Sequence, residues 1–164
     1  MVDFDTESMV RPETAVSGDA IAASFDEGAN HGVFRFDPQR SQVQDYYQKQ
    51  PAAFLRDHAR IEGTDECALD MGLISMQWDY VEALFAFGAS ACDAEGSVLQ
   101  RLAEGHIAFD IYLEMLTASL PQLSFREYRE RVGDRSRLSP AELQACYDAF
   151  HAFPLGGVLA QSAQ

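Results

Sequence analysis

Three side chains that could bind a metal ion follow one another at intervals of four residues: His106, Asp110 and Glu114. On an α-helix this spacing places an imidazole and two carboxylates along one face, where they could hold a divalent cation. His106 also occupies an apolar position in a repeat of leucines, which favours a buried histidine that hydrogen-bonds to a neighbour. We therefore predict no metal site and no cofactor, with these three residues as the alternative metal ligands.

Motifs for nucleophilic catalysis are weak in this sequence. The segment Gly88-Ala-Ser-Ala-Cys92 lacks the final glycine of a nucleophile elbow, and it follows a predicted helix where the motif needs a strand. Cys67, Cys92 and Cys146 are widely spaced, and their odd number favours free thiols in a reducing compartment over a disulfide framework. We predict a protein without catalytic residues.

Carboxylates are the most abundant groups that could bind a partner. The chain has 26 acidic and 12 basic side chains, for a formal net charge of −14. Residues 1–95 hold 18 of the acidic side chains and 6 of the basic ones. Such a surface repels nucleic acid and anionic membranes and attracts basic proteins; ordinary solubilising charge is the alternative. We predict that a partner binds at Asp65, Glu66, Asp70, Asp79, Glu82, Asp93 and Glu95.

Two long helices within residues 64–120 are predicted to position these side chains. The first would cover residues 65–87, where apolar residues recur at intervals of three and four and Trp78 falls on the buried side. The second would begin at a capping box that starts with Ser97 and continue to Leu120. Because the connection between them is short, we expect the two helices to pack antiparallel.

Shorter segments complete the predicted bundle. Residues 19–28 and 41–61 have helical patterns, and capping boxes at residues 124–127 and 139–142 predict two more helices. Residues 32–36 alternate as a strand does, but no second clear strand is available to pair with them, so we expect an extended segment packed on helices. The sequence therefore predicts an all-α fold, a single-domain bundle of five or six helices around the central antiparallel pair.

The length of 164 residues and the apolar fraction of 47% suit one folded domain. We predict an acidic N-terminal arm at residues 1–18, a helical domain at residues 19–155 and a C-terminal tail at residues 156–164. No apolar run is long enough to span a membrane, and the acidic N-terminus is unlike a secretory signal. These features, with the free thiols, predict a cytoplasmic protein.

Residues 78–88 run from Trp-Asp-Tyr-Val-Glu to Phe-Gly and are followed by a polar turn and an amphipathic helix. This helical hairpin resembles the helical region of immunity proteins that pair with polymorphic bacterial DNase toxins. The resemblance implies an all-α fold and direct, non-catalytic neutralisation of a basic toxin by an acidic surface.

The charge pattern and the resemblance together predict a non-enzymatic function. The principal hypothesis is an acidic binding protein that inhibits a basic protein partner, specifically an immunity protein that neutralises a nuclease toxin, without binding nucleic acid or membrane. Electrostatic attraction would make association fast and sensitive to salt. The alternatives are a nucleic-acid mimic that blocks a phage-defence or host enzyme, and a small metal- or cysteine-dependent enzyme. The oligomeric state is not specified by the sequence.

Overall fold

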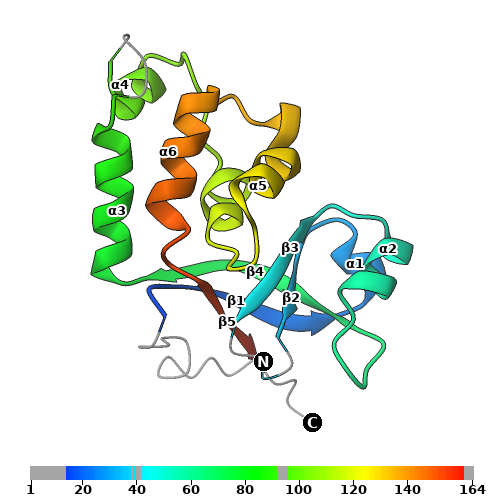
Figure 1. Ribbon diagram of the computed structural model, residues 1–164. Helices are drawn as coiled ribbons and strands as arrows, with labels where there is room; N and C mark the ends of the chain where they lie inside the picture. The colour runs from blue at the N-terminus through cyan, green and yellow to red at the C-terminus, as the bar shows by residue number, and fades with distance from the viewer. Residues whose placement is uncertain (1–13, 38, 40–41, 92–95, 161–164) are drawn as a thin grey trace. The chain divides into compact units, whose positions relative to one another are not determined.

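The computed structural model describes residues 14–37, 39, 42–91 and 96–160 (Figure 1). These residues divide into two compact units. The sheet unit contains the described residues up to 77 together with residues 154–160, and the helical unit contains those between 78 and 153.

A mixed sheet forms the sheet unit. Its strands are β1 Val16–Ala23, β2 Gly32–Phe36, β3 Val43–Gln48, β4 Cys67–Met76 and β5 Leu155–Ala160. Their order is β3-β2-β4-β1-β5. All neighbouring pairs are antiparallel except β1 and β5, which are parallel.

The sheet curls so that its two edge strands meet. An antiparallel bridge joins Gln42, directly before β3, to Gly156 in β5. Because successive side chains of a strand point to opposite faces, every second residue faces the inside of this curl. The buried side chains of the inner face include Val16, Ala20, Phe34, Val43 and Leu155.

Two short helices, α1 Phe25–Gly28 and α2 Ala52–His58, cover part of the outer face. α1 begins at a capping box, in which the Ser24 hydroxyl accepts from the Glu27 amide and the Glu27 carboxylate accepts from the Ser24 amide. The residues buried between these helices and the sheet are Phe25, Val33, Leu55, Ala59 and Cys67.

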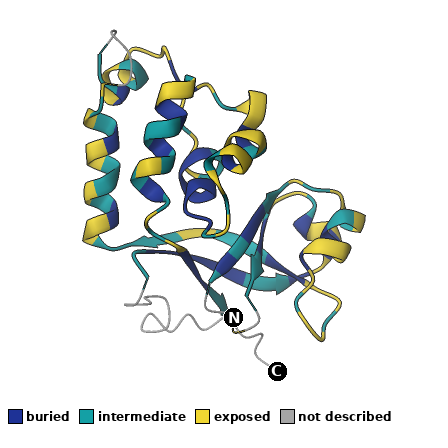
Figure 2. Cartoon of the chain, viewed as in Figure 1, coloured by how far each residue is buried: buried dark blue, intermediate teal, exposed yellow. Residues whose placement is uncertain are grey.

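The helical unit contains α3 Trp78–Ala89, α4 Val98–Ala103, the π-helix η1 Ile111–Leu116, α5 Phe125–Val132, the 3₁₀ turn η2 Gly133–Arg135 and α6 Pro140–Phe150. Its buried residues gather on α6 and on the segment that begins with η1 (Figure 2). Phe150 lies at the centre, with ring centroids 5.2 Å from Tyr80 and 5.8 Å from Phe87. The Tyr80 hydroxyl lies 2.9 Å from the Ser119 hydroxyl, which satisfies both buried groups.

A buried ion pair joins α4 to α6. The Arg101 guanidinium lies 2.6 Å from the Glu142 carboxylate, and the two side chains are 13% and 1% exposed. Glu142 also accepts from the Ser139 amide at the start of α6. Breaking a pair of this kind leaves the other charge buried without compensation.

The expected all-α fold is wrong, because the protein is an α/β structure. Residues 67–76, expected within the first long helix, form β4 between β1 and β2. The helix begins only at Trp78, and this residue is 66% exposed although we predicted it to be buried. The spacing of apolar residues in this segment fits a helix as well as a strand. The strands that pair with β4 are distant in sequence, so no local pattern indicated the pairing.

The second predicted helix is also interrupted. Ser97 caps α4 as expected, but the helix ends at Ala103 and Gly105 adopts a φ of +74°. A glycine in this left-handed region is a common helix terminator. The central antiparallel pair expected at residues 64–120 is therefore replaced by a strand, two α-helices and a π-helix.

Both predicted capping boxes near the C-terminus are confirmed, at the starts of α5 and α6. Residues 41–61, expected to be helical, contain β3 as well as α2. Residues 16–18 of the predicted arm belong to β1 and residues 156–160 of the predicted tail belong to β5; residues 14 and 15 precede β1, and residues 1–13 and 161–164 lie outside the described ones. Within the described residues, no helix has the length and apolar character needed to cross a membrane.

We expect Gly32→Ala to destabilise the sheet unit by about 1–3 kcal/mol, because a methyl group there would overlap the Tyr46 hydroxyl and ring. Gly88→Ala is the matched control, since its added carbon meets only Leu99 at 3.7 Å and alanine favours the helix. Urea denaturation measures both variants. Equal stability of the two would contradict the close packing of Tyr46 over Gly32.

Arg101→Met should lower the free energy of unfolding by about 3–5 kcal/mol, because Glu142 would remain buried without its cation. Arg126→Met, which removes an exposed pair with Glu130 on α5, should cost less than about 1 kcal/mol. Thermal or urea unfolding distinguishes the two, and a loss at Arg101 no larger than at Arg126 would refute the buried pair.

Candidate functional site

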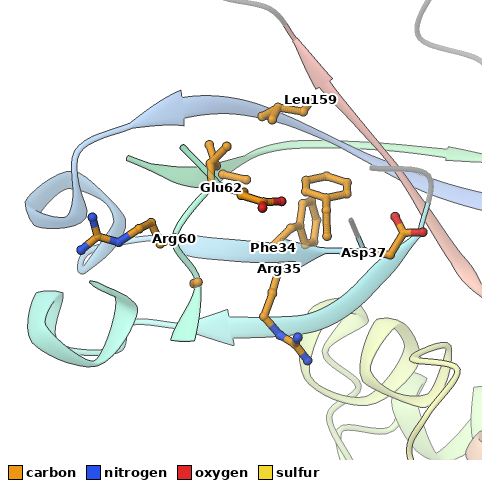
Figure 3. A pocket seen from close by; sticks show the side chains of 10 residues that line it. Phe34, Arg35, Asp37, Arg60, Glu62 and Leu159 are labelled. Carbon is orange, nitrogen blue, oxygen red and sulfur yellow. The ribbon is translucent and has the colours of Figure 1, made fainter. Parts of the chain in front are cut away.

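A pocket of about 190 Å³ lies in the sheet unit, between the inner face of the curled sheet and the connection from α2 to β4 (Figure 3). Phe34 and Phe36 of β2, Ala68 of β4 and Leu159 of β5 form its apolar wall. The volume is below the ~300–1,000 Å³ of pockets that hold drug-sized ligands. It therefore suits one small ring more than a whole nucleotide.

Glycines on distant strands make room for the two phenylalanine rings. A side-chain carbon at Gly18 of β1 would lie 2.7 Å from Phe34, and one at Gly157 of β5 would overlap Phe36. Gly18 and Gly157 are partners in the parallel pairing of β1 with β5. The centroids of Phe34 and Phe36 lie 6.2 Å apart, with the ring planes at 76°. The aromatic wall is thus held in one edge-to-face arrangement.

Two carboxylates lie at the rim of the pocket. The side chain of Glu62 points toward Phe34, and Asp37 lies at the end of β2 (Figure 3). The backbone N–H of Gln42 donates to the Asp37 carboxylate at 3.1 Å, which fixes the Asp37 side chain. Ionised carboxylates accept hydrogen bonds and donate none, so this rim is suited to a ligand rich in hydroxyl groups.

The two arginines of the lining turn their guanidinium groups away from the pocket (Figure 3). Arg35 lies 2.8 Å from Asp45, whose carboxylate also accepts from the Tyr47 hydroxyl at 3.0 Å. Burial and the neighbouring Asp45 charge raise the pKa of Tyr47. Arg60 pairs with Asp65 at 3.1 Å. The pocket interior therefore favours an uncharged polyol ring over a phosphate group.

Two carboxyl groups in β1 and β4 are shielded from solvent. Asp70 accepts from the Gly72 amide at 2.8 Å and from the Tyr46 hydroxyl at 3.4 Å, and burial raises its pKa. Asp19 is only 7% exposed, and one of its oxygens has no hydrogen-bond partner. Burial, and then the charge of Asp70, raise the pKa of Asp19. Both groups hold a proton to a higher pH than an ordinary aspartate.

The predicted acidic binding face is not one helical face. Asp65 and Glu66 precede β4 and Asp70 lies within it, whereas Asp79 and Glu82 lie on α3 in the other unit. Glu82 accepts from the Trp78 indole at 2.8 Å. Asp93 and Glu95 lie outside the described residues. Binding of a basic partner by these carboxylates stays a prediction, without the helix that was expected to align them.

The three alternative metal ligands have separate environments. His106 is exposed beside Glu104, Asp110 caps η1 through the amides of residues 112 and 113, and Glu114 is buried and accepts from the Asp110 amide at 2.7 Å. Burial raises the pKa of Glu114. No cluster of three or more metal-ligating side chains occurs among the described residues.

The described thiols are poor nucleophiles. Burial raises the pKa of Cys146 to about 12 and also raises that of Cys67. A thiol attacks as its thiolate, and burial disfavours that form at both positions. Cys92 lies outside the described residues. The burial of these two thiols thus gives no support to a cysteine-dependent enzyme.

A family model described as the fucose pyrophosphorylase domain matches residues 1–163. The chain belongs to the fucose pyrophosphorylase domain family. No curated protein matches the chain. Membership of the fucose pyrophosphorylase domain family, which is a family of enzymes, shows that the resemblance to immunity proteins of DNase toxins is wrong. The same finding overturns the predictions of a non-enzymatic toxin inhibitor and of a nucleic-acid mimic.

Sequence reasoning missed the pocket of this fucose pyrophosphorylase domain because it missed the sheet. The alternation in residues 32–36 was recognised, but its partner strands in residues 43–48 and 67–76 were assigned to helices. The signal that could have identified the first partner is Val43-Gln-Asp-Tyr-Tyr-Gln48, which is rich in β-branched and aromatic residues. No local signal points to Glu62, which reaches the pocket only through the chain path after α2.

Stability of the protein should depend on the ionisation of Asp19. Because burial raises its pKa in the folded state, its contribution is most favourable below the unfolded pKa of about 3.9 and is lost as pH rises through the folded pKa. Asp19→Asn should therefore reduce the fall in unfolding free energy between pH 4 and pH 7. Asp57→Asn removes the same charge from the exposed side of α2 and serves as the control. Identical pH profiles for wild type and Asp19→Asn in urea denaturation would contradict this assignment.

Proposed function

We propose that this protein is a sugar-1-phosphate nucleotidyltransferase that acts on fucose 1-phosphate. A phosphate oxygen of the sugar phosphate attacks the α-phosphorus of a nucleoside triphosphate, the bond to the leaving diphosphate breaks, and pyrophosphate is released. The observation that carries this proposal is the match to the fucose pyrophosphorylase domain over nearly the whole chain. The pocket of the sheet unit supports it, because its size and chemistry suit a single sugar ring.

In this proposal the sugar ring lies against the aromatic wall of the pocket. Phe36, which is partly exposed, and Leu159 would contact the carbon-bound hydrogens of the ring and the methyl group of a 6-deoxy sugar. Glu62 and Asp37 would accept hydrogen bonds from ring hydroxyls. The nucleotide would extend outside the pocket, whose volume of about 190 Å³ accommodates the smaller partner only.

A cytoplasmic location is part of the proposal. Cys67 and Cys146 are free thiols, as expected in a reducing compartment.

Isothermal titration with fucose and with fucose 1-phosphate tests the sugar pocket. Phe36→Ala should lower the affinity for both ligands by about tenfold, because it removes the aromatic surface that would contact the sugar ring. Glu62→Gln is a milder second variant, since Glu62 is exposed and its loss does not disturb the core. Phe85→Ala, an exposed phenylalanine of α3, is the matched control and should bind as wild type does.

Turnover is measured as fucose-1-phosphate-dependent release of pyrophosphate from each of the four nucleoside triphosphates. Release with at least one of them is expected, and it should fall in the Phe36→Ala protein. Failure of the wild-type chain to bind either sugar and to release pyrophosphate would refute the proposed function.

A further inference from the structure

Two arginines of the sheet unit share one aromatic ring. The guanidinium carbon of Arg56 lies 5.1 Å from the centroid of Phe25, and that of Arg60 lies 5.6 Å from the same centroid. Both distances are within the range of a cation–π contact. Phe25 is only 3% exposed and packs with Leu55 in the core under α1 and α2, so the ring is a fixed platform for two cations.

Acidic neighbours do not fully neutralise this pair. Arg56 forms no ion pair with any of the described residues. Arg60 pairs with Asp65, but the two side chains are 43% and 79% exposed, and a solvent-exposed pair of this kind is readily exchanged. Glu27, near the same core, is engaged by the amide and hydroxyl of Ser24. Adjacent like charges repel, so an anion that contacts both guanidinium groups would be favoured.

The helix dipole explains only part of this arrangement. Arg56 lies in the last turn of α2, where a cation is favoured by the partial negative charge of the helix end. Arg60 lies beyond the end of the helix and is held by the Phe25 ring and by carbonyl groups of residues 56 and 64. Nε and Nη1 of Arg60 donate to residues 56, 64 and 65, which leaves Nη2 for a ligand, and Arg56 has no ion pair among the described residues, so the two side chains retain donors suited to phosphate oxygens.

The arginine pair adjoins the pocket. Arg60 belongs to the pocket lining, directly before Ile61 and Glu62, and its guanidinium points outward from the rim (Figure 3). Because this guanidinium faces away from the pocket interior, it is placed for a phosphate group that lies outside the pocket beside its rim, and Arg56 contacts the same Phe25 ring. We infer that Arg56 and Arg60 form a phosphate-binding site at the rim of the pocket. Its ligand is a phosphate group of a sugar phosphate or of a nucleotide, and that identity rests on the proposed function.

Titration of the whole chain with inorganic pyrophosphate, fucose 1-phosphate and fucose tests this site. Arg56→Gln and Arg60→Gln should each lower the affinity for at least one of the two anions by roughly tenfold, and the double variant should lower it further. Binding of uncharged fucose should change little. Arg126→Gln, an exposed arginine of α5 in the helical unit, removes the same charge and should bind every ligand as wild type does.

The anion that loses more affinity identifies the source of the phosphate. A larger loss for fucose 1-phosphate assigns the site to the sugar phosphate, and a larger loss for pyrophosphate assigns it to the nucleotide. Arg56→Lys and Arg60→Lys keep the charge without the planar fork, so they should restore part of the affinity if the protein folds normally.

Wild-type protein that binds neither anion, or a double glutamine variant that binds both anions as wild type does, would overturn the phosphate site. If the wild-type protein does not bind fucose but binds pyrophosphate in an arginine-dependent way, the phosphate site is retained and the sugar pocket is rejected. The two proposals therefore fail separately.

Discussion

The rings of Phe34 and Phe36 pack inside the curled sheet because Gly18 and Gly157 have no side chains to occupy that space. The curl brings β5 back to the start of β3, where Gln42 bridges to Gly156. A small closed sheet has little internal volume, so large rings are accommodated only where opposing strands have glycine or another small residue. The apolar wall of the pocket follows from this packing, as does the position of β5 beside β1.

Charge is distributed over the sheet unit in a way that the net value of −14 does not reveal. Carboxylates at the pocket rim, Asp37 and Glu62, lie near solvent, whereas Asp19 and Asp70 are withdrawn and their pKa values are raised. The arginines at positions 56 and 60 gather on a buried ring. An acidic protein can thus contain a local cationic site. The contacts of the two guanidinium groups with the Phe25 ring act at short range, whereas the net negative charge of the rest of the protein is screened by salt.

The helical unit is held together by different interactions. Its core combines an aromatic group around Phe150 with the buried Arg101–Glu142 pair and the Tyr80–Ser119 hydrogen bond. These polar contacts connect elements that are about 40 residues apart in sequence, with separations of 41 for Arg101 to Glu142 and 39 for Tyr80 to Ser119. Buried polar groups need specific partners, so the first contact restricts how α4 packs on α6 and the second restricts how α3 packs on the segment that follows η1.

The sequence by itself determined the features that depend on neighbouring residues. Ser124 with Glu127 and Ser139 with Glu142 predicted the starts of α5 and α6, because a capping box is complete within four residues. Ser97 likewise predicted the start of α4. Only the tertiary structure decided that residues 67–76 are a strand, since their apolar spacing also fits a helix and their hydrogen-bond partners lie in β1 and β2. The same holds for the pocket: Phe34, Glu62 and Leu159 come together through strand register and sheet closure, which are non-local and leave no local pattern in the sequence.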